Sequence, residues 1–465
     1  MKPTWRALPL TVACAIALGA AASRADVASE VRAATGARTR IVWCRDAGNG
    51  ADAFARSDKL QLVGFDSHDG RGVRTILDRP ANYAKPMIVP KGDRVVFSDR
   101  RRGKVFVVNF DGTGLRELVG GFALDVWAEP KTDRPWVYVK TGKAERKSPI
   151  RRYRIDRPGA GELVWDKSAT DLDSFQLSAD GTRAGGLFPW PACGLAALPN
   201  RSVKQLGRGC WTALAPDNSY LLWYFDGAHR NLTIHAPTGR RIAKIAINSA
   251  PGISGYEVYH PRWSNHVRFM TMTGPYKVGR GGDRIRGGGT DVEVYLGRFN
   301  KTLTDVEKWV RITYDRKGDF FPDAWVEPGK GPHENAYAAP KPTTGPTTSR
   351  PATKRKKPER VVVRARLVSV TATPEPRSIL PYRRALVAYG YEVVEVVSGK
   401  CPDKKILAAH WCIVDGKVQP VAGLKPGVTR RLTLELFDEK PELESERLIM
   451  HPSQLDLPLY YDAGR

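Results

Sequence analysis

The feature that most constrains the fold of this chain is a hairpin pattern that recurs through residues 85–272. Stretches beginning at residues 85, 174, 211 and 260 read KPMIVPKGDRVVFSD, SFQLSADGTRAGGLF, WTALAPDNSYLLWYF and HPRWSNHVRFMTM. Each contains a short apolar strand, a turn rich in Gly, Asn or Asp, and a second apolar strand. His266 takes a turn position in the fourth stretch. Repetition of one unit at a fixed spacing indicates a repeat architecture.

A second pattern accompanies these hairpins. Stretches at residues 61, 106 and 232 read QLVGFDSHDGRGVRTIL, FVVNFDGTGLRELV and LTIHAPTGRRIAKI, each with a strand, a Gly-containing turn, a basic residue and another strand. Two hairpins per repeat make a four-stranded antiparallel sheet, and a spacing of about 40 residues matches one propeller blade. The predicted complete blades cover 84–119, 123–167, 173–208, 210–248 and 257–313.

The remaining strand-like segments lie at the two ends of this region. RIVWCRD at residue 40, QLVGFD at 61 and VRTIL at 73 supply three strands, and DFFPDAWVEPG at 319 supplies an innermost strand. Joining these segments into one sheet closes a ring and removes free sheet edges. We therefore expect an all-β protein with a six-bladed β-propeller over 38–330, with seven blades as the alternative.

The hairpin pattern resembles the TolB-type (WD40-like) propeller repeat of exported bacterial proteins. The turns SADG, APDN and PKGD, followed by an FDG-type turn and a basic residue, carry this resemblance. It implies a propeller that binds a partner protein or a ligand, and some relatives carry the propeller beside a hydrolase domain. The segment Gly252-Ile253-Ser254-Gly255 does not complete a GxSxG nucleophile motif, and the tail is too short for an α/β-hydrolase.

The first residues are typical of a secretory signal peptide over 1–25. Lys2 and Arg6 precede an apolar run over 8–22, which ends at a Ser23-Arg24-Ala25 cleavage site. The run is shorter than the roughly 20 residues that a membrane-spanning helix needs. We expect a periplasmic or secreted protein that has no membrane span.

The chain is strongly basic, which bears on its partners. The formal net charge is +25, and it becomes +22 without residues 1–25, which hold three basic residues and no acidic one. Outside the cytoplasm, a basic surface favours an anionic polysaccharide or an envelope protein as partner. The KRKK run at 354 and the RGGDRIRGGG run at 280 are consistent with a solvated linker and a loop, so no nucleic-acid partner is expected.

A linker and a second domain follow the propeller. Residues 338–360 are rich in Pro, Thr and Lys, which predicts a disordered basic linker. Residues 361–465 contain several strand-length segments in which apolar and polar residues alternate, which predicts a small C-terminal β-barrel or β-sandwich. The spacing of Tyr391, Val393, Val396 and Gly399 resembles that of an OB-like barrel.

Five cysteines follow the leader: Cys44, Cys193, Cys210, Cys401 and Cys412. An oxidising compartment allows disulfides, and the odd count leaves at least one thiol unpaired. Cys193 and Cys210 each flank a turn-rich stretch and form the best candidate pair, while the pairing of the other three stays open. No CxxC or His-rich spacing indicates a zinc site.

The candidate site residues lie where chain segments lead into the innermost strands, because these segments cluster around one mouth of a propeller channel. They are Asp125, Asp173, Trp211, Glu257, His260, Arg262, Asp319 and Asp323. Carboxylates and a neutral imidazole suit a divalent metal, which makes His260 the candidate metal ligand. The alternative is structural, since aspartates at strand starts cap turns and His260-Pro261 simply begins a strand. Most tryptophans are expected to fill gaps between blades, with Trp211 or Trp263 as candidates for stacking on a sugar.

Two functions follow from these features. The first is an exported, non-catalytic binding or scaffold protein that acts at the cell envelope on an anionic ligand or a protein partner, without a cofactor. The alternative is a metal-assisted lyase or hydrolase of acidic saccharides, in which Arg262 holds a substrate carboxylate. Convergence of His260, the mouth carboxylates and a further histidine would favour the enzyme, whereas dispersed turn-capping side chains would favour the binding protein.

Overall fold

The structure is a computed structural model that describes residues 27–52, 55–142, 147–253, 255–276, 291–329, 359–451, 454 and 457–464. The predicted signal peptide over 1–25 lies outside the described residues, as does the predicted linker over 338–360 except for its last two residues. In the part of the chain that the structure describes, no helix is long and apolar enough to cross a membrane.

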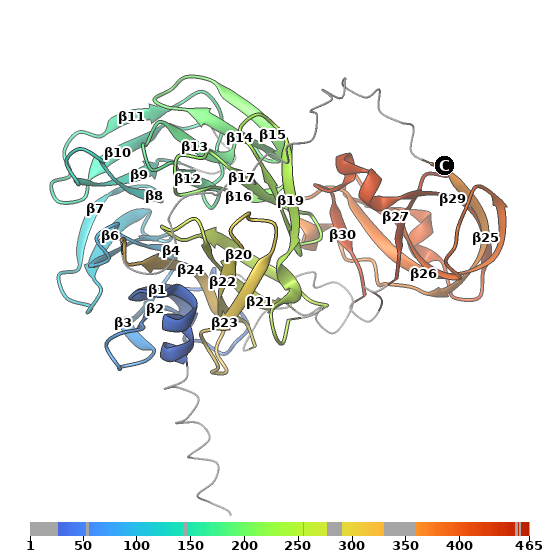
Figure 1. Cartoon of the computed structure of the whole chain (residues 1–465), viewed down its shortest axis with the longest axis horizontal. Helices are drawn as coiled ribbons and strands as arrows, with labels where there is room; N and C mark the ends of the chain where they lie inside the picture. The colour runs from blue at the N-terminus through green and yellow to red at the C-terminus, as the bar shows by residue number, and fades with distance from the viewer. Residues whose placement is uncertain are drawn as a thin grey trace, which may run out of the picture.

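Six four-stranded antiparallel sheets surround one axis and form a six-bladed propeller (Figure 1). From the innermost strand outward, three sheets are β4 (Tyr83–Ile88), β5 (Arg94–Asp99), β6 (Lys104–Asn109) and β7 (Arg116–Gly120); β8 (Phe122–Ala128), β9 (Pro135–Lys140), β10 (Ile150–Arg154) and β11 (Glu162–Trp165); and β12 (Phe175–Leu177), β13 (Arg183–Leu187), β14 (Ala192–Ala197) and β15 (Val203–Arg208). Two more are β16 (Cys210–Leu214), β17 (Leu222–Phe225), β18 (Asn231–His235) and β19 (Arg241–Ala246), which η1 (Ile247–Ser249) follows; and β20 (Glu257–Trp263), β21 (Phe269–Tyr276), β22 (Glu293–Phe299) and β23 (Val306–Arg311).

The sixth sheet closes the ring with strands from both ends of the propeller. Its order is β24 (Asp319–Val326), β1 (Thr39–Asp46), β2 (Leu60–Asp66) and β3 (Arg74–Ala81). The late strand β24 is innermost and pairs with β1, as the sequence predicts. Every residue of β24 is buried, whereas β3 is largely exposed, so burial decreases from the channel outward. The expectation of six blades is confirmed, and the alternative of seven is wrong.

Two tryptophans at the ends of innermost strands hold neighbouring blades together. Trp325 of β24 donates its indole N–H to Pro90 O at 2.7 Å, and Trp127 of β8 donates to Ala179 O at 2.9 Å. Each ring lies against a turn glycine of the next blade. A Cβ on Gly92 would lie 2.7 Å from the Trp325 ring, and one on Gly181 would lie 2.5 Å from the Trp127 ring. The turn glycines that mark the repeat therefore also make room for an inter-blade contact.

This contact predicts the effect of Gly92→Ala. Gly92 has φ +79°, which disfavours an L-residue, and the new methyl group would in addition overlap Trp325. We expect Gly92→Ala to lower the free energy of unfolding by about 2 kcal/mol more than Gly70→Ala does, measured by urea denaturation. Gly70 is the matched control, because its φ is +69° and no atom lies within 4 Å of its added Cβ. Equal losses would show that Trp325 has room to move.

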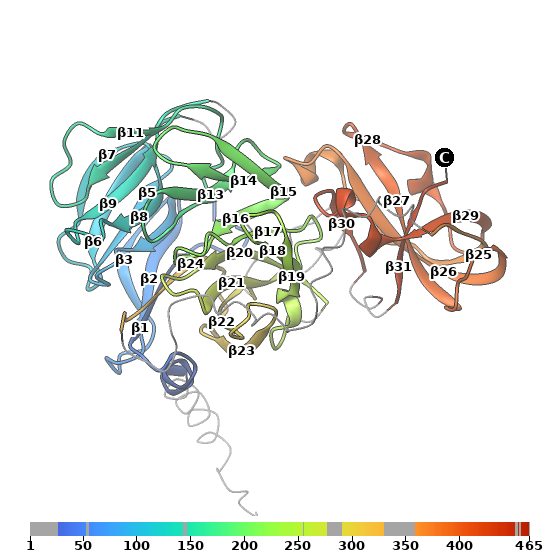
Figure 2. The same cartoon turned by 45° about the horizontal axis from the view of Figure 1, so that its top comes forward.

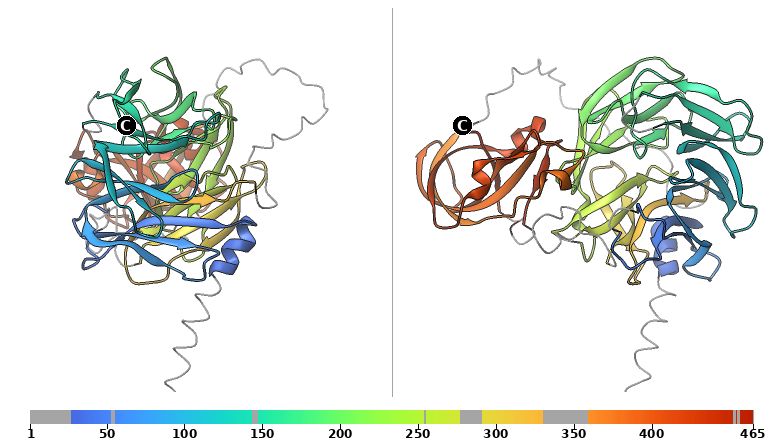
Figure 3. Two further views of the ribbon diagram at one scale, coloured as in Figure 1. Left: turned by 90° about the vertical axis from the view of Figure 1, so that its left-hand side faces the viewer. Right: turned by 180° about the vertical axis from the view of Figure 1, so that it is seen from behind.

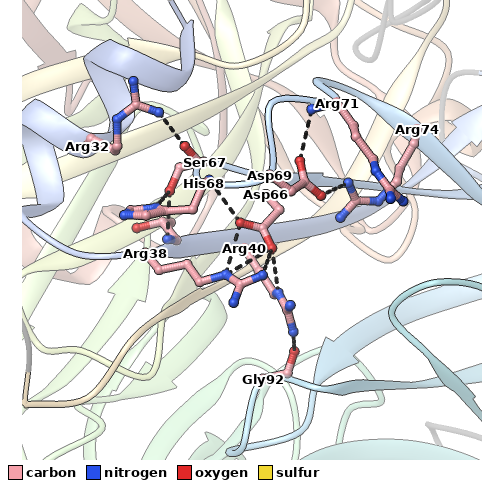
Figure 4. A network of polar contacts seen from close by, with 11 residues as sticks. Arg32, Arg38, Arg40, Asp66, Ser67, His68, Asp69, Arg71, Arg74 and Gly92 are labelled. Atoms are coloured by element: carbon pink, nitrogen blue, oxygen red, sulfur yellow. Dashed lines mark hydrogen bonds and ion pairs between the residues drawn. The ribbon is translucent and has the colours of Figure 1, made fainter.

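An N-terminal helix over residues 27–35 packs on the closing sheet, and a polar network anchors the chain beside it (Figure 4). Arg32 donates to Ser67 O at 2.5 Å. Arg38 and Arg40 pair with the buried carboxylate of Asp66 at 2.7 and 2.8 Å. Burial by itself would raise the pKa of Asp66, but the two guanidinium groups outweigh it and lower the pKa to about 2.

The C-terminal region forms a separate closed β-barrel of five strands: β25 (Val361–Ser369), β26 (Ala385–Ser398), β27 (Lys405–Val414), β29 (Thr429–Leu436) and β31 (Leu459–Asp462). β27 and β31 pair in parallel, and the neighbouring pairs are antiparallel. The short strands β28 (Lys417–Val418) and β30 (Arg447–Ile449) extend the sheet, and the 3-10 helices are η2 (Pro376–Ile379), η3 (Pro420–Gly423), η4 (Phe437–Glu439) and η5 (Pro441–Leu443). The predicted small β-domain is therefore a barrel of the five-stranded, OB-like kind.

The barrel lies against the side of the propeller, next to β19 (Figure 2; Figure 3 shows the same contact from behind). The backbones touch directly, since the Gly227 amide donates to Glu444 O at 2.8 Å and the Leu448 amide donates to Gly227 O at 3.1 Å. A Cβ on Gly227 would lie only 1.9 Å from Glu446 O, so this approach requires glycine.

The predicted disulfide between Cys193 and Cys210 is not present in the structure. Cys193 lies in β14, and its Sγ is 3.7 Å from Pro191 O. Cys210 begins β16 of the next blade, where its Sγ is 3.7 Å from Phe225 O and accepts a hydrogen bond from the Tyr382 hydroxyl at 3.5 Å. The two cysteines belong to different sheets. Although they are close in the sequence, their sulfur atoms therefore do not form a bond.

Candidate functional site

Four innermost strands carry the same backbone irregularity. Lys85, Trp211, His260 and Phe321 have φ values of 45°, 44°, 55° and 53°, in the left-handed region that non-glycine residues rarely adopt. Each lies at a break in register against the second strand of its blade. β-bulges of this kind redirect a side chain, and they are frequent next to functional sites. Here they bring four large side chains to one place on the propeller axis.

These four side chains line a cavity in the mouth of the channel. Its other lining residues include Asp173, Gln176, Thr212 and Arg262, and its volume of ≈ 20 Å³ is small. A cavity of this size accommodates a water molecule or one small chemical group. Four of the eight predicted site residues meet here: Asp173, Trp211, His260 and Arg262.

The cavity contains two ionisable groups whose pKa values are shifted towards neutrality. Burial and the nearby carboxylate of Asp171 raise the pKa of Asp173 to about 6. Burial, together with the charge of Arg262, lowers the pKa of Lys85 to about 8. The Lys85 ammonium donates to Leu172 O at 3.0 Å and so remains beside Asp173. Shifts of this kind, in a concave site, are typical of functional residues.

Two buried polar atoms of the cavity residues have no hydrogen-bond partner among the described residues. They are Oδ1 of Asp173 and Oε1 of Gln176. The amide oxygen only accepts hydrogen bonds, and so does the ionised carboxylate. Unsatisfied buried acceptors are uncommon in proteins, so a group that donates hydrogen bonds is the natural complement of this cavity.

A buried ion triad closes the floor of the cavity. Arg262 donates from Nε to Asp323 Oδ1 at 2.6 Å and from Nη2 to Asp125 Oδ1 at 2.8 Å. The second oxygen of Asp323 accepts from the Ile88 amide, and that of Asp125 accepts from the Leu177 amide, both at 2.8 Å. The triad and its two backbone partners therefore tie together strands of five blades. The triad also separates the mouth from a second cavity of ≈ 230 Å³ at the other end of the channel.

His260 forms part of the aromatic wall of the mouth. Its Nδ1 lies 2.8 Å from Thr273 Oγ1, and its ring lies 4.9 Å from that of Trp211 and 4.1 Å from that of Phe321. Across the described ranges, no group of three or more His, Cys, Asp or Glu side chains is arranged to hold a metal ion. His266 lies in the turn between β20 and β21.

Two predicted mouth residues belong to other clusters. Asp319 pairs with Arg45 at 2.9 Å and accepts from the Trp43 indole at 2.7 Å inside the closing blade. Burial raises its pKa to about 6. Glu257 faces the barrel, where its carboxylate meets His229, Tyr259 and Arg447. A residue that lies at the start of an innermost strand, or within it, therefore does not always point its side chain into the channel.

Sequence reasoning missed Lys85, Gln176, Thr212 and Phe321. A signal was available for two of them, since Lys85-Pro86, His260-Pro261 and Phe321-Pro322 occupy the same place relative to their hairpins. Proline lacks a backbone donor, so it marks an interruption of strand pairing. The recurring X-Pro pair therefore marks the bulge, and its first residue is the one that lines the channel.

No protein-family model matches the chain, and no curated protein matches it in sequence. Solved structures of similar fold include TolB from Acinetobacter baumannii, which is 14% identical, with 65% of this chain and 71% of that chain covered and a TM-score of 0.39. A nidogen/laminin complex is 12% identical (44% and 92% covered, TM-score 0.33), and Kuenenia stuttgartiensis hydrazine synthase is 13% identical (54% and 76% covered, TM-score 0.34). These likenesses concern the fold alone.

Proposed function

We propose that this protein is a non-catalytic binding protein of the cell envelope, and that the mouth of its propeller channel binds an acidic saccharide, one small group of which enters the cavity. The observation that carries the proposal is the set of four left-handed residues around one cavity. Each such residue costs of order 1–3 kcal/mol, and strain of this kind persists mainly where function requires it. Four instances at matching positions point to a site that the fold maintains for a ligand.

The chemistry of the cavity favours a saccharide. Sugar hydroxyls donate hydrogen bonds, which the unpartnered oxygens of Asp173 and Gln176 accept. The half-buried ring of Trp211 lies in the cavity wall and offers an apolar surface for a sugar ring. Arg100, Lys85 and Arg56 act electrostatically on Asp173, so the carboxylate lies in a basic surrounding. These cations favour a saccharide that also bears a carboxylate.

The envelope location rests on the leader predicted over 1–25 and on the basic net charge of +25. The barrel supports a scaffold role, because a direct backbone contact at Gly227 fixes it to the propeller. A protein partner would then meet two domains in one fixed arrangement.

Calorimetric titration with oligogalacturonate, with a neutral maltooligosaccharide for comparison, tests this function. We expect oligogalacturonate to bind the intact protein more tightly than the neutral sugar. Asp173→Asn should weaken binding about tenfold, since a hydrogen bond to a charged acceptor is lost. Because the pKa of Asp173 is about 6, affinity should also fall as the pH drops through that value.

The matched control is Asp111→Asn, which changes an exposed carboxylate that caps its own turn through the Thr113 amide. It should leave binding unchanged. Equal affinity of the Asp173→Asn variant, or no binding of any saccharide, would contradict the proposal. Cleavage of the oligosaccharide during the titration would instead favour the alternative of a lyase or hydrolase.

A further inference from the structure

Another cavity, separate from the two in the channel, lies between the propeller and the barrel. It has a volume of ≈ 340 Å³, within the range of about 300–1,000 Å³ that is usual for small-molecule sites. The propeller contributes polar residues from β18, β19 and η1, including Asn231, Lys244 and Asn248. The barrel contributes an apolar wall of Phe437, Leu443, Leu448, Met450 and Leu459. The cavity is thus polar on the propeller side and mainly apolar on the barrel side, where Asp438 and Glu444 also line it.

Arg230 is the unusual residue of this cavity. It lines the cavity, it is only 7% exposed, and neither Nε nor Nη1 has a hydrogen-bond partner among the described residues. A buried guanidinium without partners is costly, because desolvation is not compensated by hydrogen bonds. Glu257 lies near enough to act on Arg230 electrostatically, but its two oxygens are already engaged by Arg447 and by His229 and Tyr259.

The other charged side chains of the cavity already have partners. Lys244 pairs with Glu444 at 3.5 Å and with Asp438 at 3.4 Å. Asp226 accepts hydrogen bonds from the Asn231 amide group at 2.6 Å and from the Arg230 backbone N–H at 3.0 Å. Among these charges, the guanidinium of Arg230 is therefore the group that an incoming anion would meet.

We propose that this cavity binds an amphipathic monocarboxylate, whose carboxylate pairs with Arg230 and whose apolar body lies against the barrel wall. A carboxylate matches the forked donors of a guanidinium. A single negative charge fits better than a phosphate, since Asp226 and Glu444 also line the cavity and would repel a second charge. Because both domains line the cavity, the bound molecule stabilises their contact. This site is distinct from the channel mouth and does not depend on the function proposed for it.

The test uses decanoate as probe, with decanol and decyl phosphate as comparisons, on the full chain. Binding is followed by calorimetry and by the shift in melting temperature. Decanoate should bind one molecule per chain and raise the melting temperature, and decanol should bind about tenfold more weakly because it cannot pair with the guanidinium. Decyl phosphate should also bind more weakly than decanoate, and tighter binding would overturn the choice of a singly charged ligand.

Arg230→Met is the decisive variant. It should lose about tenfold in affinity for decanoate yet remain folded, because a buried guanidinium whose Nε and Nη1 lack hydrogen-bond partners has been removed. Arg241→Met is the matched control, since Arg241 lies on the neighbouring strand β19, pairs with Glu444 at 3.6 Å and is 43% exposed. This variant should bind decanoate as the unchanged protein does. Undiminished binding to Arg230→Met would overturn the proposal.

A second measurement does not depend on any variant. Decanoate that carries a diazirine at its apolar end can be photocrosslinked to the unchanged protein, and the modified peptides can be mapped by mass spectrometry. The label should fall on the apolar wall, over 437–450 or at Leu459. Labelling elsewhere in the propeller or the barrel would show that decanoate binds at another place and would overturn the assignment.

Discussion

Arg447→Met is expected to lower the free energy of unfolding by about 3–5 kcal/mol, because it leaves a buried carboxylate without its cation. Arg447 is 1% exposed and donates to Glu257 Oε1 and, at 2.9 Å, to Gly227 O. The other oxygen of Glu257 lies 3.1 Å from His229 Nδ1 and accepts from the Tyr259 hydroxyl at 3.1 Å. The pair therefore joins the barrel to the propeller through a buried polar cluster.

Urea denaturation and hydrogen exchange measure this effect. The amides of Gly227 and Leu448, which bond across the domain contact, should lose protection in Arg447→Met. Arg364→Met is the control, because Arg364 pairs with Glu395 at 3.2 Å on the barrel surface with both side chains exposed. A pair of that kind contributes about 0–1 kcal/mol. If Arg447→Met costs no more than this control, the buried pair does not hold the domains together.

The pH dependence of stability provides a further check on the same pair. Burial by itself would raise the pKa of Glu257, but Arg447, His229 and Arg230 outweigh it and lower the pKa to about 2 from an ordinary value of 4.5. The ionised carboxylate therefore stabilises the folded state at pH values above 4.5, and this contribution is lost as the pH falls towards 2. The Glu257→Gln variant should lack that part of the acid dependence.

Arg262→Leu should have an effect of similar size in the propeller, again about 3–5 kcal/mol. Arg262 is the cation shared by Asp125 and Asp323, and without it two buried carboxylates would lie close together without a counterion. The pKa of Asp323, which burial already raises, should then rise further, so the folded variant would take up protons more readily than the unfolded chain. The loss of stability should consequently shrink as the pH is lowered.

Circular dichroism during urea unfolding, at several pH values, measures this prediction. Lys104→Leu is the control, since Lys104 pairs with Glu117 at 2.7 Å on the propeller surface. Changing both Asp125 and Asp323 to Asn within Arg262→Leu removes the two uncompensated charges and should restore part of the lost stability. If the triple variant is as unstable as Arg262→Leu alone, the packing of Arg262, rather than its charge, supports the channel.

The candidate site could be predicted from the sequence only in part. Four residues of the channel mouth were predicted correctly: Asp173, Trp211, His260 and Arg262. The prediction succeeded because the chain segments that lead into the innermost strands of a propeller gather around one mouth of its channel. Glu257 met the same criterion and faces the barrel instead, since the domain contact formed on that side of the ring. Gln176 was missed because nothing in its local sequence distinguishes an amide that lines a channel from one that faces solvent.

The sequence by itself determined the hairpins, the number of blades, the closure of the ring by β24 and the presence of a small β-domain. These features follow from turn residues and from apolar alternation, which act over a few neighbouring residues. The tertiary structure alone decided the contacts of Arg262 with Asp125, 137 residues away, and with Asp323, 61 residues away. It also decided the pair of Arg447 and Glu257, which are separated by 190 residues. Such contacts depend on how six sheets close around an axis and on where the barrel attaches. Local periodicity in the sequence does not specify which residues meet across such long separations along the chain.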